Sequence, residues 1–355
     1  MSVTGVDPSI DPSRRLTPVV RLAPAKLNLT LAVIGRRPDG YHALHSVVVP
    51  LALADRLSLA MAAGEPDTLA VTGFDPGAGD NLVLRAIAAT RRGARASWPG
   101  APAEPPSLAA RLEKRIPVAA GLGGGSSDAA AAIDGALEAW SAELDDEART
   151  EIGLEVGSDV PLFLAGGAVL IEGRGERVTP LHGVLCGPDA EPGVVLVTPN
   201  VAQHTRQVFA AWAGGAMAEP GVARRTSEHF ASEFGSGLTV QRLIERAAVL
   251  ASANDLLPAA LAVLPGLVGL RHALARTLSR PIGLSGSGPT LWALYPSLGD
   301  AQLAARQVDT AIDDGTVESP GDGRPSVIAT TIQSAAQPTA PLSTDPAFPE
   351  RRTVQ

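Results

Sequence analysis

A glycine-rich stretch that leads into an alanine-rich segment has the clearest chemical signature in this chain. Four of the five residues from 121 to 125 are glycine, and Ser126 and Ser127 follow them at the start of a run of strong helix formers. Glycine lets the backbone approach a ligand closely, and the free N–H groups at a helix start point toward negative charge. A tight turn before a surface helix would need only one or two glycines. The pattern therefore predicts a phosphate-binding loop, with Ser126 or Ser127 capping the helix.

The loop does not match the two commonest nucleotide motifs. A Walker loop ends in Gly-Lys-Ser/Thr, whereas these glycines run directly into Ser126 without a lysine. A dinucleotide fingerprint would need glycine at position 126 and a place near the start of a doubly wound sheet. We therefore expect a phosphate loop of another class.

Lys26 and Asp159 are the candidates for catalysis. Only two of the 29 basic residues are lysine, Lys26 and Lys114. Because the chain otherwise uses arginine, we expect a lysine to act as a compact charge that arginine cannot supply. The alternative for Lys26 is an ordinary strand lysine with its ammonium in water. Asp159 follows Gly-Ser and precedes Val-Pro, which suits either a base at the edge of a site or an aspartate that caps a turn or helix.

Two further stretches are candidate ligand contacts. Tyr41 and His42 follow the Pro-Asp-Gly turn at 38–40, and two rings at a loop tip suit a planar ligand such as a nucleobase. Gly286 and Ser287 belong to a second glycine turn, whose N–H groups can form a nest for an anion. In each case an ordinary turn is the alternative.

The order of the predicted elements indicates an α+β protein. We expect strands at residues 19–34 and 45–59, an irregular hairpin and loop at 61–80, a helix from residue 81, a strand at 108–113 and then the glycine loop with its helix. The second half alternates strands with helices around the second glycine turn. We place a tail at 1–18, a first domain at 19–180, a second domain at 181–335 and another tail at 336–355.

Composition limits the classes of function. The 355 residues carry a net charge of −8, which argues against general nucleic-acid binding. Cys186 is the only cysteine, so the chain has no intramolecular disulfide and no cysteine-based metal cluster. No apolar run is long enough for a membrane span, and the first 15 residues lack the apolar core of a secretory signal. We expect a cytoplasmic protein, either a monomer or a homodimer, that contacts neither nucleic acid nor membrane.

Three motifs in order resemble those of the GHMP kinases, the family of galactokinase, homoserine, mevalonate and phosphomevalonate kinases. They are Pro-Ala-Lys-Leu-Asn-Leu at 24–29, the loop at 117–127, and Gly-Leu-Ser-Gly-Ser-Gly at 283–288. The match is closest to the branch that phosphorylates a cytidine-diphosphate sugar alcohol in the non-mevalonate isoprenoid pathway, and Asp-Gly-Tyr-His at 39–42 is its most specific part. The resemblance covers residues 21 to 333.

The resemblance implies a ribosomal-S5-like first domain and a ferredoxin-like second domain, with the active site between them. It implies ATP and Mg²⁺ as cofactors and a small substrate with a cytidine diphosphate group. The residues that match family positions are the catalytic Lys26 and Asp159; the ATP-binding Asn81, Lys114, Pro117, Gly121, Gly123, Gly124, Gly125, Ser126 and Ser127; and the substrate-binding Asn28, Tyr41, His42, Gly286 and Ser287. Ser127 is also a candidate Mg²⁺ contact.

In such an enzyme Asp159 accepts a proton from the substrate hydroxyl, and Lys26 stabilises the developing alkoxide. Another small-molecule kinase of the family, of the homoserine or mevalonate type, is the alternative. The segment from His204 to Phe209 departs from the usual Ser-Thr pattern, which leaves the substrate contacts of the second domain open.

Overall fold

A computed structural model describes residues 18–62, 66–75, 77, 81–95, 104–185, 191–215 and 221–333. The two predicted tails, at 1–18 and 336–355, lie outside the described residues apart from residue 18, and so does Cys186. None of the helices in these ranges is both long and apolar enough to cross a membrane.

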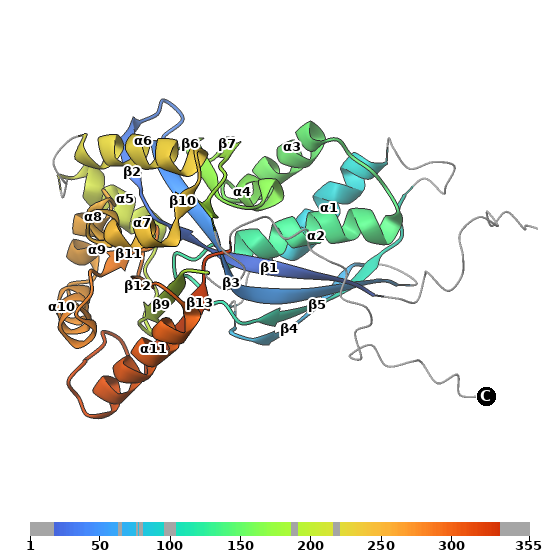
Figure 1. Cartoon of the computed structure of the whole chain (residues 1–355). Coiled ribbons are helices and arrows are strands. Elements are labelled where there is room, and N and C mark those ends of the chain that lie inside the picture. The colour runs from blue at the N-terminus through green and yellow to red at the C-terminus, as the bar shows by residue number, and fades with distance from the viewer. Residues whose placement is uncertain are drawn as a thin grey trace, which may run out of the picture.

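The first half of the chain forms a seven-stranded sheet with the order β4-β5-β3-β6-β7, in which β1 and β2 also pair with β3 (Figure 1). The 20-residue β3 is its longest strand and contacts four others. The strands are β1 (Val19–Asn28), β2 (Ala32–Arg36), β3 (His42–Met61), β4 (Thr68–Gly73), β5 (Leu108–Lys114), β6 (Val169–Gly173) and β7 (Arg177–Pro180).

Helices cover one face of this sheet at its β1-β3-β5 end. The helix α2 (Gly124–Trp140) lies against β1 and β3, and α1 (Leu82–Ala94) lies beside it (Figure 1). The alanine run of α2 is buried, and small side chains let the helix come close to the strands. A methyl group on Gly135 would collide with Leu59 of β3. Two shorter helices follow, α3 (Asp146–Val156) and α4 (Val160–Ala165).

The second half builds a four-stranded sheet in the order β11-β12-β9-β13. Both of its faces are covered, which explains why every residue of β9 is buried. Val194 and Leu196 pack toward β1 and β3, whereas Val195 and Val197 pack toward the helices on the outer face. The strands are β9 (Gly193–Thr198), β11 (Gly283–Leu284), β12 (Leu291–Tyr295) and β13 (Ser326–Thr331), and a separate pair is β8 (Val184–Leu185) with β10 (Leu238–Thr239).

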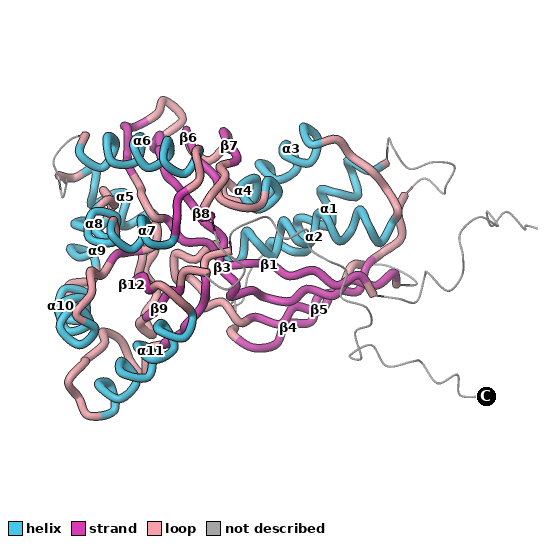
Figure 2. Tube along the Cα trace, viewed as in Figure 1, coloured by secondary structure: helices cyan, strands magenta, loops and turns pink. Residues whose placement is uncertain are grey.

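Helices make up most of the remaining second half (Figure 2). They are α5 (Thr205–Ala213), α6 (Val222–Gly235), α7 (Val240–Glu245), α8 (Ala247–Ser252), α9 (Leu257–Val263), α10 (Gly266–Leu278) and α11 (Leu298–Asp313).

The α+β class is confirmed, and so are the helix after residue 81 and the strand at 108–113. The predicted hairpin within 61–80 is wrong. The strand β4 instead runs parallel to β5, and a parallel pair needs a crossover, which α1 provides. The seven-stranded sheet ends at Pro180 and the four-stranded sheet begins at Gly193, but the limits of the two domains stay a prediction.

Candidate active site

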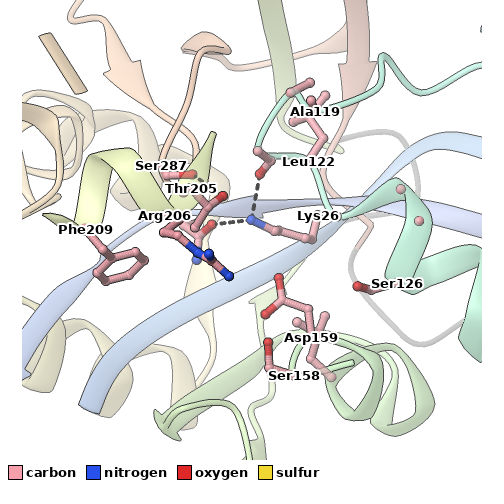
Figure 3. A pocket seen from close by; sticks show the side chains of 18 of the residues that line it. Lys26, Ala119, Leu122, Ser126, Ser158, Asp159, Thr205, Arg206, Phe209 and Ser287 are labelled. Atoms are coloured by element: carbon pink, nitrogen blue, oxygen red, sulfur yellow. Dashed lines mark hydrogen bonds between the residues drawn. The ribbon is translucent and has the colours of Figure 1, made fainter. Parts of the chain in front are cut away.

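A cavity of about 1160 Å³ opens between the glycine loop and elements of the second half. Every predicted site residue except Ser127 lines it. Figure 3 shows Lys26, Asp159 and Arg206 directed into this space from three different elements. The structure thus brings together residues that are far apart in the chain.

The glycine loop meets the helix α2 at Gly123, which has a left-handed backbone with φ of 72° and no side-chain cap. The expectation that Ser126 or Ser127 caps this helix is therefore wrong. Both serines already lie inside its first turn, because the glycine conformation starts the helix earlier than a serine cap would. The first N–H groups of α2 are left without side-chain partners from a cap, as an anion site at a helix start requires.

The loop is held by contacts with both halves of the chain. Its carbonyl oxygens accept hydrogen bonds from the backbone N–H of Lys26, at 2.9 Å, and from the hydroxyl of Ser285, at 3.0 Å. Gly121, with φ of 77°, lies so close to the second glycine turn that a methyl group there would strike the carbonyl oxygen of Ser285. The second glycine turn therefore supports the phosphate loop directly.

Lys26 is buried at the floor of the cavity, with 5% of its surface exposed. Its Nζ donates hydrogen bonds of 2.6 Å to Asn28 Oδ1 and of 2.6 Å to the carbonyl oxygen of Gly121. Burial lowers the pKa of Lys26 below the usual 10.5, and the negative charge of Asp159 opposes that effect. The strand-lysine alternative, with an ammonium in water, is excluded by this burial.

The orientation of Asn28 is fixed from its other side. Its Nδ2 donates to the Ser46 hydroxyl at 2.8 Å, and that hydroxyl donates to the carbonyl oxygen of Thr30 at 2.6 Å. The amide oxygen of Asn28 therefore faces Lys26, and β1 and β3 together hold the lysine in place.

Asp159 stands immediately before α4 and its side chain makes no capping hydrogen bond to that helix. Figure 3 shows its carboxylate pointing into the cavity on the side facing Lys26. Among the described residues, no ion pair within 4.0 Å joins the two side chains. A base and a cation that face each other without direct contact leave room for a hydroxyl group between them.

The two serines of the loop have different surroundings. Ser126 lines the cavity and is shown beside it in Figure 3. Ser127 is 1% exposed and does not line it, and its Oγ has no hydrogen-bond partner within the described part of the chain. The side chain that faces the cavity is thus that of Ser126.

Lys114 also lines the cavity, but its ammonium is engaged by two carboxylates. It forms buried ion pairs with Asp55 Oδ2 and, at 2.7 Å, with Asp128 Oδ2. Asp55 Oδ1 accepts the backbone N–H groups of Arg115, at 2.5 Å, and Ile116, at 2.8 Å. Burial raises the pKa of Asp128 to about 7, although Lys114 opposes the shift. Sequence reasoning missed both acids, which lie 59 and 14 residues from Lys114.

Asn81 caps the helix α1 and lines the same cavity. Its Oδ1 accepts the backbone N–H of Val83 at 2.9 Å. The Nδ2 group is the part of this side chain that is left for a ligand.

Aromatic rings gather at the end of the cavity near β2 and α5. The His42 ring stacks on Phe209, with centroids 4.9 Å apart, and meets the edge of Trp212 at 5.4 Å. Burial, followed by the charge of Arg36, lowers the pKa of His42 below 6.5, so the neutral ring predominates at pH 7. Its buried Nε2 has no hydrogen-bond partner among the described residues. Tyr41 is exposed, with the Arg174 guanidinium 5.4 Å from its ring.

The segment that departed from the expected pattern contributes three cavity residues, Thr205, Arg206 and Phe209. The Thr205 hydroxyl lies 2.9 Å from that of Ser287, which links α5 to the second glycine turn. The sequence signal for Phe209 was its place at the end of the segment that departs from the family pattern. Arg206 had no signal of its own.

The family model described as "GHMP kinases N terminal domain" matches residues 81–167. Over 293 residues the chain is 36% identical to a 4-diphosphocytidyl-2-C-methyl-D-erythritol kinase of Rhizobium meliloti, covering 81% of this chain and 89% of that protein. It is 39% identical over 298 residues to the enzyme of the same name from Cereibacter sphaeroides, covering 81% of this chain and 93% of the relative.

Solved structures show the same likeness. A crystal structure of 4-(cytidine 5'-diphospho)-2C-methyl-D-erythritol kinase, 31% identical, superposes with a TM-score of 0.61 over 88% of this chain and 99% of the other. A homoserine kinase from Cytophaga hutchinsonii has a TM-score of 0.62 at 17% identity, over 94% of this chain and 98% of the other. The backbone alone therefore does not separate these two kinds of kinase, whereas the sequence does.

Proposed function

The chain belongs to the 4-diphosphocytidyl-2-C-methyl-D-erythritol kinases, within the GHMP kinase family, and on this premise we propose how its residues perform the reaction. The enzyme uses ATP to phosphorylate 4-diphosphocytidyl-2-C-methyl-D-erythritol, a step of the non-mevalonate isoprenoid pathway. The accepting group in our proposal is the C2 hydroxyl of the methylerythritol part.

The observation that carries the proposal is the position of Lys26 and Asp159 between the glycine loop and the aromatic end of the cavity. Asp159 accepts the proton of the C2 hydroxyl as that oxygen attacks the γ-phosphorus of ATP. A new oxygen–phosphorus bond forms while the bond to the β-phosphate oxygen breaks, and ADP leaves. Lys26 stabilises the negative charge that develops on the attacking oxygen and on the transferred group.

The glycine loop binds the phosphates of ATP in this proposal. Its free backbone N–H groups and the start of α2 face negative charge, which develops further in the transition state. Lys114 contributes mainly by holding the loop, because its ammonium is bound by Asp55 and Asp128. Asn81 remains a contact for the adenosine part through its Nδ2 group.

Mg²⁺ accompanies ATP in this proposal. The described residues hold no cluster of three or more His, Cys, Asp or Glu side chains that would bind a metal by itself. Mg²⁺ is commonly held by substrate phosphates together with few protein ligands, and this site fits that arrangement. Ser126 is the hydroxyl that would contact the ion, since Ser127 does not line the cavity. When bound, the ion would neutralise charge on the phosphates.

The aromatic end of the cavity takes the cytosine. His42 offers a neutral ring with an unpaired Nε2, which can bond to a base edge, and Tyr41 and Phe209 offer faces for stacking. Asn28, Gly286 and Ser287 line the middle of the cavity, where the methylerythritol part would lie.

The test is an ATP-consumption assay with 4-diphosphocytidyl-2-C-methyl-D-erythritol, with homoserine and mevalonate as competing acceptors. We expect turnover with the first substrate only, and phosphorus NMR of the product should show a new phosphate monoester. Preferred turnover of homoserine or mevalonate would overturn the substrate assignment.

Replacing the base tests the mechanism. Asp159→Asn should lower kcat by about 10² or more, the amount that a general base contributes. Asp146→Asn is the control, because Asp146 lies on the exposed surface of α3 and does not line the cavity. Near-wild-type turnover of Asp159→Asn would show that another group takes the proton.

A further inference from the structure

Arg206 occupies a position in the cavity that no motif predicted. It is the second residue of α5 and lies three residues before Phe209, so the two side chains leave the helix from neighbouring positions. Figure 3 shows its guanidinium directed into the cavity, between Phe209 on one side and Lys26 with Asp159 on the other. Arg206 therefore lies between the aromatic end and the catalytic pair.

Arg206 is exposed and lines the cavity. Within the described part of the chain, no salt bridge or hydrogen bond is formed by its guanidinium. Arg36 also lines the cavity and forms no ion pair among the described residues, but its charge acts on the His42 ring at the aromatic end. Arg37 is paired with Asp39 and Glu176, and Arg174 lies over the Tyr41 ring while its charge contributes to the lowered pKa of Asp39.

An exposed guanidinium in a cavity can bind carboxylate or phosphate through two parallel N–H donors. The substrate of the proposed function carries its cytosine and its reacting hydroxyl on opposite sides of a diphosphate. With the cytosine at His42 and Phe209, and the hydroxyl at Lys26 and Asp159, the diphosphate must cross the space that Arg206 faces. The expected ligand chemistry and the position of the cation agree.

We propose that Arg206 binds the diphosphate of the substrate and so positions the reacting hydroxyl relative to the bound cytosine. The inference rests on the proposed function, because another acceptor would place no diphosphate there. It gives α5 a second role beside stacking, and it supplies a substrate contact from the second half of the chain. Arg206 is a binding residue that selects a diphosphate-linked substrate over a plain nucleoside.

Steady-state kinetics of Arg206→Ala test this role. The KM for the diphosphate substrate should rise by about 10-fold to 100-fold, the loss expected for a hydrogen-bonded charge contact, while the KM for ATP stays unchanged. Arg206→Lys keeps the charge without the planar fork, so its KM should lie between those of the wild type and the alanine variant. Arg306→Ala is the matched control, since it removes an arginine from the exposed side of α11, outside the cavity.

Inhibition at saturating ATP separates the diphosphate from the base. CDP should inhibit the wild type more strongly than cytidine does, and Arg206→Ala should reduce this preference by about 10-fold or more. An unchanged preference, or an increase in the KM for ATP in place of that for the substrate, would overturn the inference. If the wild type turns over no diphosphate substrate at all, it is the proposed function that fails. If the wild type does turn over the diphosphate substrate and Arg206→Ala has the same KM for it, only the role of Arg206 fails.

Discussion

Gly286 lies directly against the catalytic lysine, and its replacement by alanine tests how closely the site is packed. A methyl group at this position would stand 3.2 Å from Lys26 Nζ, 3.3 Å from Asn28 Oδ1 and 3.3 Å from the carbonyl oxygen of Gly121. The first of these atoms is the ammonium nitrogen, and the other two are the acceptors of its hydrogen bonds. The methyl group therefore forces Lys26 or its partners to move.

Two effects of Gly286→Ala can be estimated separately. The backbone at this position has φ of 57°, where a non-glycine residue costs roughly 1–2 kcal/mol of stability. The displacement of Lys26 acts on catalysis. Because a misplacement of about 1 Å costs about 10²-fold in rate, a shift of about half that size should lower kcat by about 10-fold.

Gly315→Ala is the matched control for the backbone effect. Gly315 has φ of 78° and no atom within 4 Å of an added methyl group, so the variant carries the strain without the contact. Thermal unfolding and ATP-consumption assays would be run on both variants. We expect similar losses of thermal stability and a lower kcat in Gly286→Ala alone. Equal unfolding temperatures with wild-type kcat in both variants would refute the claim that the lysine position is sterically fixed.

Two predictions concern the buried lysines. Lys114→Met should lower the free energy of unfolding by roughly 3–5 kcal/mol, because it leaves Asp55 and Asp128 buried without their cation. The pKa of Asp128 is raised to about 7, so this carboxyl group favours folding at low pH and loses that contribution as the pH rises through about 7. The unfolding temperature of Lys114→Met should therefore fall more steeply than that of the wild type from pH 5 to 8. Burial lowers the pKa of Lys26, so kcat should fall as the pH rises toward 10.5. Over the same pH range the contribution of this lysine to stability should rise. If the pH profile of the residual activity of Lys26→Arg kept the same basic limb, the assignment of that limb to Lys26 would be contradicted.

The residues that sequence reasoning could predict are those whose local pattern carries the chemistry. The run of glycines identified the phosphate loop, because one segment contains both the flexible backbone and the helix start. The scarcity of lysine pointed to Lys26, which is buried at the floor of the cavity. The motifs around Tyr41 and His42 singled out the branch of the family.

What could not be predicted depends on contacts between distant segments. The acids that hold Lys114 come from β3 and α2, and nothing near them in the sequence marks them as a pair. The burial of Ser127 follows from where α2 begins, which the glycine at 123 decides. The position of Arg206 depends on how α5 is placed against the first half, and that placement is a property of the packed core.

The hydrogen bonds that hold the glycine loop have a consequence for the thermodynamics of binding. The carbonyl oxygens of Gly121 and Leu122 are already bound by groups from β1 and from the second glycine turn. The loop is thus preorganised, and little conformational entropy remains to be lost when a nucleotide arrives. We therefore expect the loop to bind the phosphates of ATP without first rearranging.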